Sequence, residues 1–228
     1  MDEATRALID GFMRMQQAQV LEGYRLRNRF ARKGQIVFAG SSLMENFPVA
    51  EFELNDIEET AARGRVVYNR GIGGYVAKDL LAALEPCVLD LEPSAVFLNI
   101  GTNDVATPGY RLERLIAVYE RILARIREAL PACRIVLLAY YPVNAVADYP
   151  GMPGMSKEEM FATRNNPTLR EASEAVRALA ARTGCEYVDA NEGLFDAAGD
   201  LRADFASEGV HLLPHAYAIV WENLKKLI

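Results

Sequence analysis

The sequence predicts one α/β domain in which helices cover both faces of a five-stranded parallel sheet. Two observations favour this three-layer fold class. Five short segments rich in β-branched or apolar residues alternate with longer stretches of helical periodicity, and these short segments are apolar throughout. Strands of that kind are typical of parallel sheets that are buried on both faces. A chain of 228 residues is long enough to bury a sizeable core.

The expected elements follow one another along the chain. The predicted strands are 35–39 (QIVFA), 66–69 (VVYN), 95–99 (AVFLN), 134–140 (RIVLLAY) and 186–189 (EYVD). The predicted helices are 76–84, 111–130, 168–183 and 215–227. Pro167 and Gly184 bracket the third of these helices, as expected of an N-terminal proline and a C-terminal glycine. Residues 141–166 show no clear period, so we expect either part of a binding site or lid, or a surface excursion.

Residues 1–34 are predicted to form a helical extension that precedes the domain of residues 35–228. Ile9, Met13, Val20 and Tyr24 recur at roughly helical spacing. Gly34 is expected to end this helix. An apolar stripe of this kind must be buried, either on its own domain or across a homodimer interface.

Composition and charge exclude several classes of protein. Acidic residues outnumber basic residues by 31 to 25, which argues against general nucleic-acid binding. No apolar run approaches the roughly 20 residues needed to span a bilayer, and the polar N-terminus is unlike a secretory signal. The three cysteines, Cys87, Cys133 and Cys185, fit neither a disulfide framework nor a CxxC zinc site. We therefore expect a protein of the reducing cytoplasm.

Candidate chemical groups follow three predicted strands, where ligands bind in open parallel sheets. These segments are 40–46 (GSSLMEN), 69–75 (NRGIGGY) and 99–104 (NIGTND). Ser42 either presents its hydroxyl beside the free N–H groups of a helix start or merely caps that helix. Asn103 either caps the next turn or donates its amide to a developing oxyanion. The glycines of 71–74 resemble a dinucleotide-binding loop, but Val76 stands where the third glycine is expected.

The chain has two histidines, His211 and His215, so chemistry that needs an imidazole depends on them. Glu208 lies three residues before His211, close enough for its carboxylate to orient the ring as a catalytic base requires. The alternative is a surface histidine with an incidental acidic neighbour. A zinc site of the two histidines is disfavoured, because Pro214 lies between them and the glutamate of HExxH is missing.

Together these segments resemble, in order, the sequence blocks of the SGNH/GDSL family of serine esterases and lipases. GSSL at 40–43 is similar to the GDSL nucleophile block, and GIGG at 71–74 to the glycine block. GTND at 101–104 matches the GxND block, and EGVH at 208–211 matches the terminal block. The resemblance spans residues 35–220.

This resemblance implies a flavodoxin-like sheet and a role for each site residue. Ser42 would be the nucleophile, His211 the general base and acid, and Glu208 the carboxylate that orients it. The backbone N–H groups of Ser42 and Gly74 and the side chain of Asn103 would form the oxyanion hole. The family hydrolyses small-molecule esters through an acyl-enzyme and needs neither a metal nor a cofactor.

Two positions depart from the family pattern. Ser41 replaces the aspartate that usually precedes the nucleophile, and Glu208 replaces an aspartate with a side chain one methylene longer. These departures leave open a non-catalytic binding or interaction protein on the same fold, since function resides in sites and not in folds. A nucleotide-binding α/β protein that uses residues 71–74 is the second alternative.

Overall fold

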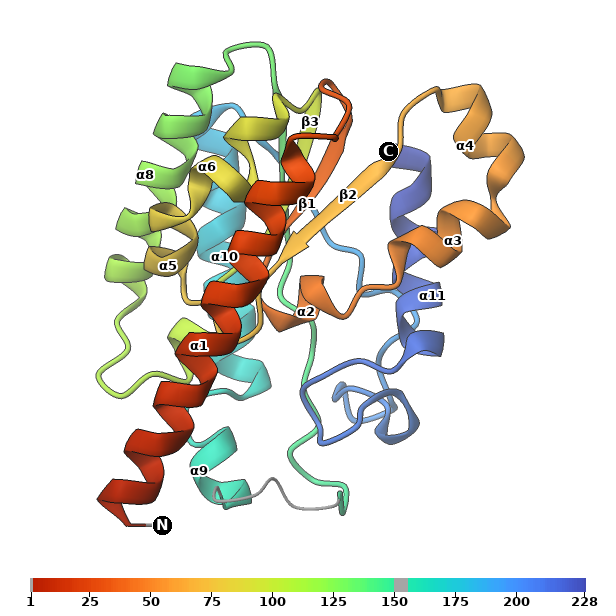
Figure 1. Ribbon diagram of the computed structural model, residues 1–228. Helices are drawn as coiled ribbons and strands as arrows, with labels where there is room; N and C mark the ends of the chain where they lie inside the picture. Colours follow the sequence, from red (N-terminus) through yellow and green to blue (C-terminus); the bar gives the residue numbers. More distant parts are fainter. Residues whose placement is uncertain (1, 150–155) are drawn as a thin grey trace.

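A parallel sheet of five strands forms the centre of the molecule (Figure 1). The computed structural model describes residues 2–149 and 156–228. The strand order is β2-β1-β3-β4-β5, and each neighbouring pair is parallel. The strands are β1 (Ile36–Gly40), β2 (Val67–Gly71), β3 (Ala95–Asn99), β4 (Arg134–Leu138) and β5 (Glu186–Val188). The predicted fold class is therefore confirmed.

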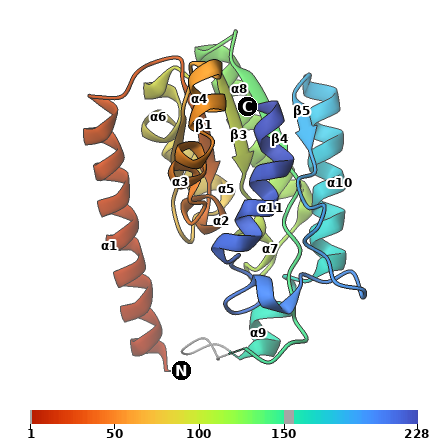
Figure 2. The same cartoon turned by 90° about the vertical axis from the view of Figure 1, so that its right-hand side faces the viewer.

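Helices pack on both faces of this sheet and form a three-layer sandwich, whose layers lie side by side in Figure 1 and one behind another in Figure 2. One face carries α1 (Glu3–Asn28), α5 (Ala77–Ala82), α6 (Leu84–Cys87), α8 (Leu112–Ala129) and α10 (Asn166–Thr183). The other face carries α2 (Ser42–Glu45), α3 (Val49–Asn55) and α11 (Pro214–Leu224). The remaining α-helices of the described residues are α4 (Ile57–Arg63), α7 (Thr102–Val105) and α9 (Lys157–Phe161).

Strand β1 shows why the strands are apolar throughout. Ile36 and Phe38 enter the core under α3 and α11, whereas Val37 and Ala39 enter the core under α5, α8 and α10. All four side chains are almost completely buried. After β2 the chain crosses to the other side of β1, so the strand order reverses between β1 and β3. Ligand sites of open α/β sheets form at the carboxyl ends of strands at this point.

Helix α1 packs against α6 and reaches the carboxyl end of β2 (Figure 1). It begins after Asp2, whose side chain accepts a hydrogen bond from the backbone N–H of Thr5 at 2.7 Å. Near its other end, Tyr24 is buried, and its hydroxyl donates to the carbonyl of Gly71 at 2.6 Å. The C-terminal half of the helix therefore buries part of its stripe against its own domain.

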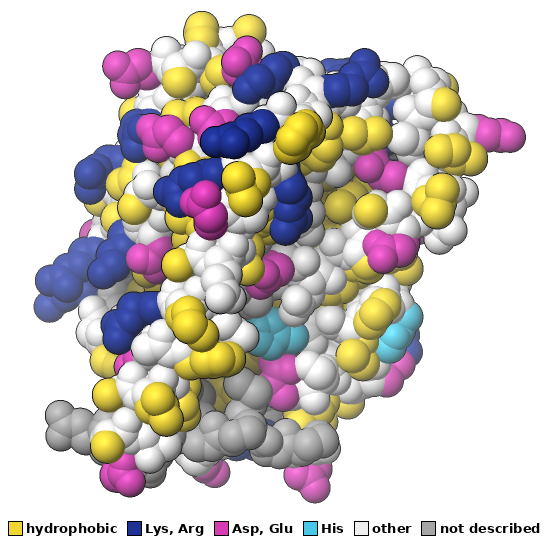
Figure 3. Space-filling model, in the orientation of Figure 1, with side chains coloured by type: hydrophobic (Ala, Val, Ile, Leu, Met, Phe, Trp, Pro, Cys, Tyr) yellow, Lys and Arg dark blue, Asp and Glu magenta, His cyan; other side chains and the backbone are white. Residues whose placement is uncertain are grey.

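The N-terminal half of α1 keeps apolar side chains on the surface. Hydrophobic side chains gather on the lower part of the molecule where this half of the helix lies (Figure 3). The large apolar residues that are exposed in this half are Leu8, Ile9, Phe12, Met13 and Met15. The homodimer predicted through this helix stays a prediction.

The end of α1 differs from the sequence-based expectation. The helix stops at Asn28, and Gly34 takes its left-handed conformation, φ +74°, six residues later. The amide of Asn28 donates to the carbonyl of Pro86 at 2.8 Å, and its oxygen accepts from the guanidinium of Arg70. These contacts with distant segments stabilise the helix end, and the local sequence does not reveal them.

Residues 141–166 are less irregular than predicted. They contain α9, in which Met160 and Phe161 are buried in the core. Tyr141 and Val143 are also buried. Residues 150–155 lie outside the described part of the chain. The short helices α3 and α4 were also not predicted, because helices of seven residues are too short for a clear period. No helix of the described ranges is long and apolar enough to cross a membrane.

Candidate active site

Ser42 lies at the turn between β1 and α2, at the carboxyl edge of the sheet. The turn is tight because Gly40 has no side chain: a Cβ there would lie 2.0 Å from the carbonyl oxygen of Asn99 on β3. Ser41 occupies the N-cap position, but its side chain makes no capping hydrogen bond. The serine pair is therefore not explained by helix capping.

Ser42 Oγ lies 2.8 Å from Nε2 of His211, although 169 residues separate the two along the chain. On the other side of the ring, Nδ1 of His211 lies 2.6 Å from Oε1 of Glu208. A hydroxyl, an imidazole and a carboxylate are thus joined in one hydrogen-bonded chain. This arrangement can pass a proton from the hydroxyl to the ring while the carboxylate orients that ring.

Glu208 is buried and hydrogen-bonded through both carboxylate oxygens. Oε1 also accepts the backbone N–H of His211 at 2.9 Å, and Oε2 accepts the hydroxyl of Ser207. Burial by itself raises the pKa of this carboxyl, but the bonds from His211 and Ser207 outweigh it and hold the pKa of Glu208 at about 2. The carboxylate is therefore ionised at neutral pH and can stabilise a protonated imidazole.

The glycine segment after β2 forms a tight turn beside the serine. The carbonyl of Ile72 accepts the N–H of Tyr75 at 3.2 Å, and Gly74 has φ +75°. A positive φ at the third position is that of a type II turn, which requires glycine there. Gly73 donates its N–H to Oε2 of Glu45 on α2 at 2.7 Å, and a Cβ on Gly73 would lie 3.9 Å from the Cβ of Ser42.

Asn103 lies in α7, directly after β3, and contacts the segment that follows the glycine turn. Its Nδ2 donates to the carbonyl of Tyr75 at 3.1 Å, and because an amide carries two N–H donors, one is left for another acceptor. The neighbouring Asp104 accepts the N–H of Ala77 at 2.9 Å. The predicted oxyanion segments are thus connected to one another by hydrogen bonds.

Comparison with known proteins identifies the family of the chain. Residues 38–219 match the model of the GDSL-like Lipase/Acylhydrolase family. The chain belongs to this family. The resemblance found in its sequence blocks is therefore confirmed.

Solved structures of this acylhydrolase fold match nearly the whole chain. A protein from Streptococcus pneumonia, provisionally described as a platelet activating factor, superposes with a TM-score of 0.85, 24% identity and coverage of 100% of this chain and 99% of its own. A GDSL-like lipase from Bacteroides thetaiotaomicron VPI-5482 has a TM-score of 0.69 and 19% identity, with coverage of 91% and 96%. A catalytic mutant of the acetylxylan esterase Axe2 from Geobacillus stearothermophilus has a TM-score of 0.66 and 17% identity, with coverage of 86% and 94%. At these identities the likeness shows the fold.

One curated relative is much longer than this chain. The N-acylneuraminate cytidylyltransferase of Escherichia coli O18:K1:H7 (strain RS218 / NMEC) is 22% identical over 203 residues, which are 89% of this chain and 42% of the relative. The chain therefore spans less than half the length of that protein.

Two further residues of the candidate site were not predicted from the sequence. Glu45, three residues after Ser42, connects helix α2 to the glycine turn through Gly73. Arg164 donates from Nη2 to Oδ1 of Asn103 at 3.4 Å, and burial lowers the pKa of its guanidinium. The i, i+3 spacing from Ser42 places Glu45 one helical turn away, but no sequence signal marks Arg164 because it follows an irregular segment.

The second histidine lies apart from the hydrogen-bonded chain. Nε2 of His215 donates to the backbone carbonyl of Asp204 at 2.7 Å, and its ring packs edge-on against Phe205. His211 contacts Ser42 and Glu208 instead. Within residues 2–149 and 156–228, no group of three or more His, Cys, Asp or Glu side chains is arranged to hold a metal ion.

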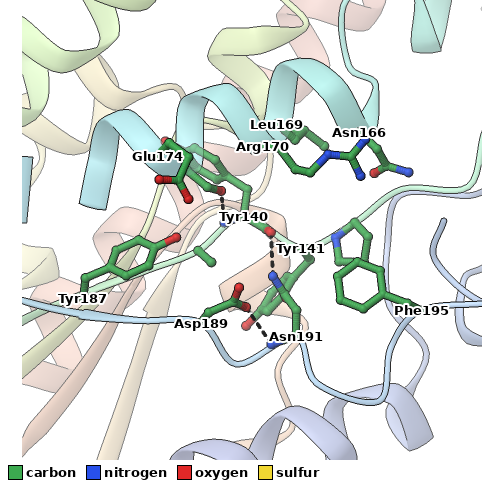
Figure 4. Close-up of a pocket in the computed structure, with 13 residues that line it drawn as sticks. Tyr140, Tyr141, Asn166, Leu169, Arg170, Glu174, Tyr187, Asp189, Asn191 and Phe195 are labelled. Carbon is green, nitrogen blue, oxygen red and sulfur yellow. Dashed lines mark hydrogen bonds between the residues drawn. The ribbon is translucent and has the colours of Figure 1, made fainter. Parts of the chain in front are cut away.

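A separate pocket lies between α10 and the segment after β5 (Figure 4). Its volume is about 270 Å³, and its lining includes Tyr140, Arg170, Tyr187 and Asp189. Two of its lining residues are joined by a hydrogen bond, in which the amide of Asn191 donates to the carbonyl of Tyr140 at 3.0 Å (Figure 4). Ser42, His211 and Glu208 do not line this pocket.

Proposed function

We propose that this acylhydrolase is a serine hydrolase that cleaves carboxylic esters through an acyl-enzyme, with no metal ion or cofactor in the reaction. The observation that supports this most directly is the 2.8 Å contact between Ser42 Oγ and His211 Nε2. A serine hydroxyl is a weak nucleophile until a base within hydrogen-bond reach accepts its proton. Glu208 supports the same role, because it is ionised and holds the opposite ring nitrogen.

The reaction proceeds in two displacements. Ser42 Oγ attacks the ester carbonyl carbon while its proton passes to His211, and the carbonyl electron pair becomes the oxyanion. When this intermediate collapses, the C–O bond to the alcohol breaks, and the alcohol takes the proton from His211. Water then attacks the acyl-enzyme with His211 as its base, and the carboxylic acid leaves as Ser42 is restored.

The oxyanion is stabilised by the backbone N–H groups of Ser42 and Gly74 and by the free N–H of Asn103. Among the described residues, neither of these two backbone groups donates a hydrogen bond within the protein. Preorganised donors of this kind are usually the largest single contribution to acyl transfer. Residues 35–228 would supply every reacting group and oxyanion donor, and residues 1–34 would be an extension.

The substrate is a small-molecule acyl or acetyl ester. The solved relatives include proteins named as lipase and as acetylxylan esterase. A series of p-nitrophenyl esters of increasing chain length measures which acyl group is accepted. If kcat/KM falls steadily beyond acetate or butyrate, the substrate is a short-chain ester.

The test of the mechanism is the Ser42→Ala variant. We expect this variant to show no burst of product and no labelling by a fluorophosphonate probe. Its kcat should fall at least a thousand-fold. Ser41→Ala is the matched control, because it removes the neighbouring hydroxyl and leaves Ser42 to react with the probe. Full esterase activity in Ser42→Ala would overturn the proposal. A wild-type serine that resists the probe would favour the non-catalytic binding protein, and a thermal shift with nucleotides would favour the nucleotide-binding alternative.

A further inference from the structure

We propose that Gln17 of helix α1 is a positioning residue for the oxyanion hole. It lies in the N-terminal extension, outside the residues 38–219 that match the family model. Its Nε2 donates to the carbonyl oxygen of Gly73 at 2.8 Å. This inference rests on the proposed function, because it gives the contact between helix α1 and the glycine turn a role in the oxyanion hole.

The geometry of the peptide bond connects this contact to catalysis. The carbonyl of Gly73 and the N–H of Gly74 belong to the same planar trans peptide, so the two groups point in opposite directions. Gln17 holds the carbonyl toward α1. The N–H of Gly74, the predicted oxyanion donor, is thereby directed away from α1.

This peptide needs such a constraint because glycines stand on both sides of it. It is the central peptide of the turn from Ile72 to Tyr75, and the positive φ of Gly74 gives the type II form. Rotation of that peptide by half a turn converts type II into type I and reverses the N–H. Glycine permits both forms at little cost. The bond from Gln17 stabilises the form in which the oxyanion donor is correctly directed.

Two neighbouring hydrogen bonds complete the constraint, and the helix lies close to the turn. The N–H of Gly73 donates to Glu45 on the side of the nucleophile helix. The hydroxyl of Tyr24, two turns further along α1, donates to the carbonyl of Gly71. A Cβ on Gly74 would lie 2.8 Å from Nε2 of Gln17, so the helix lies directly against the turn. A hydrogen bond to the carbonyl also polarises the peptide and strengthens its N–H as a donor.

The experiment replaces Gln17 with methionine, which keeps the length of the side chain and removes the donor. We expect kcat for p-nitrophenyl acetate to fall about ten- to a hundred-fold with KM nearly unchanged, less than the loss on removing an oxyanion donor outright. The affinity for a boronic acid, whose tetrahedral adduct needs the oxyanion hole, should fall by a similar factor. Gln17→Lys restores a donor and should recover part of kcat.

Gln16→Met and Gln19→Met are the matched controls on the same helix. A surface pocket lies between α1 and the glycine turn, and Gln16 and Gln19 line it together with Gln17. The side chains of Gln16 and Gln19 are exposed. Both variants should keep the wild-type kcat and melting temperature. Wild-type kcat and boronate affinity in Gln17→Met, with Ser42→Ala inactive, would overturn this inference alone. A change of KM alone in Gln17→Met, or an equal fall of kcat in the two control variants, would also overturn it. An active Ser42→Ala would instead overturn the proposed function.

Discussion

Oε1 of Glu208 accepts two hydrogen bonds from His211, from the ring Nδ1 at 2.6 Å and from the backbone N–H at 2.9 Å. One oxygen thus holds both the main chain and the side chain of the same histidine. The longer glutamate side chain therefore reaches the imidazole without leaving the carboxylate unsatisfied. The turn bends sharply at Gly209, where φ is +91° and a Cβ would lie 2.2 Å from the carbonyl of Asn144.

Replacing Glu208 with glutamine should lower kcat by about a thousand-fold or more, because the amide neither stabilises the imidazolium nor secures the correct tautomer. Glu208→Asp keeps the charge and should lose less. Steady-state kinetics on p-nitrophenyl acetate measure both, with circular dichroism as the control for folding. Equal activity of the glutamine and aspartate variants would contradict an electrostatic role for Glu208.

The pKa of Glu208, about 2 against an ordinary 4.5, also predicts a pH dependence of stability. The ionised form is favoured in the folded protein, so its contribution is present above pH 4.5 and is lost as the pH falls toward 2. Glu208→Gln should therefore show a smaller loss of unfolding free energy over this range than the wild type. Urea unfolding at several pH values measures the difference, and parallel curves for the two proteins would refute it.

The raised pKa of Asp104 predicts the opposite dependence of stability on pH. Burial raises the pKa of this carboxyl from 3.8 to about 6, so ionisation destabilises the folded state. The cost is absent below pH 3.8, grows as the pH rises to about 6 and is complete above it. Asp104→Asn removes the charge, while its Oδ1 can still accept the N–H of Ala77.

We expect Asp104→Asn to be more stable than the wild type at pH 7 by on the order of 1–3 kcal/mol, with the difference vanishing near pH 4. Urea unfolding followed by the fluorescence of Trp221, the one tryptophan, measures this. A variant that is less stable at pH 7 would show that the bond from Ala77 requires the charged acceptor.

Asn103→Ala should lower kcat by about a hundred- to a thousand-fold, as expected of a lost oxyanion donor, with a smaller change in KM. Thr107→Val is the control, because the exposed Thr107 hydroxyl donates only to the carbonyl of Asn103. Kinetics on one ester and the melting temperatures of both variants separate catalysis from folding. An unchanged kcat in Asn103→Ala would remove this side chain from the oxyanion hole.

Gly71 should tolerate no side chain. A Cβ there would lie 2.1 Å from the backbone nitrogen of Glu45, so Gly71→Ala must displace helix α2. We expect a loss of about 3 kcal/mol or more of stability together with the activity. Gly34→Ala meets nothing within 4 Å and should cost about 1–2 kcal/mol through its positive φ alone. Thermal unfolding compares them, and an equal cost for both would contradict the close approach.

The predicted homodimer is tested on the exposed half of α1. Leu8 is 73% exposed and Phe12 is 52% exposed, so the double change to glutamine should leave the monomer folded. We expect light scattering to show a dimer for the wild type and a monomer for the variant. A monomeric wild type would end this prediction.

The sequence by itself determined the fold class and the order of the chemical groups. Apolar strands alternating with helices specify a covered parallel sheet, and a strand such as β1 displays this pattern within a few residues. The same local pattern marks Ser42, Asn103 and the glycine turn, because each directly follows a strand, where the fold requires tight turns and free donors.

Only the tertiary structure decided which distant groups support these residues. Gln17, Arg164 and Asn28 act on partners 56, 61 and 58 residues away, and no local period encodes such contacts. The end of α1 was misplaced for the same reason, since contacts with Pro86 and Arg70 stabilise it. Local propensity specifies where an element forms, whereas its boundaries and the orientation of a single peptide depend on what packs against it.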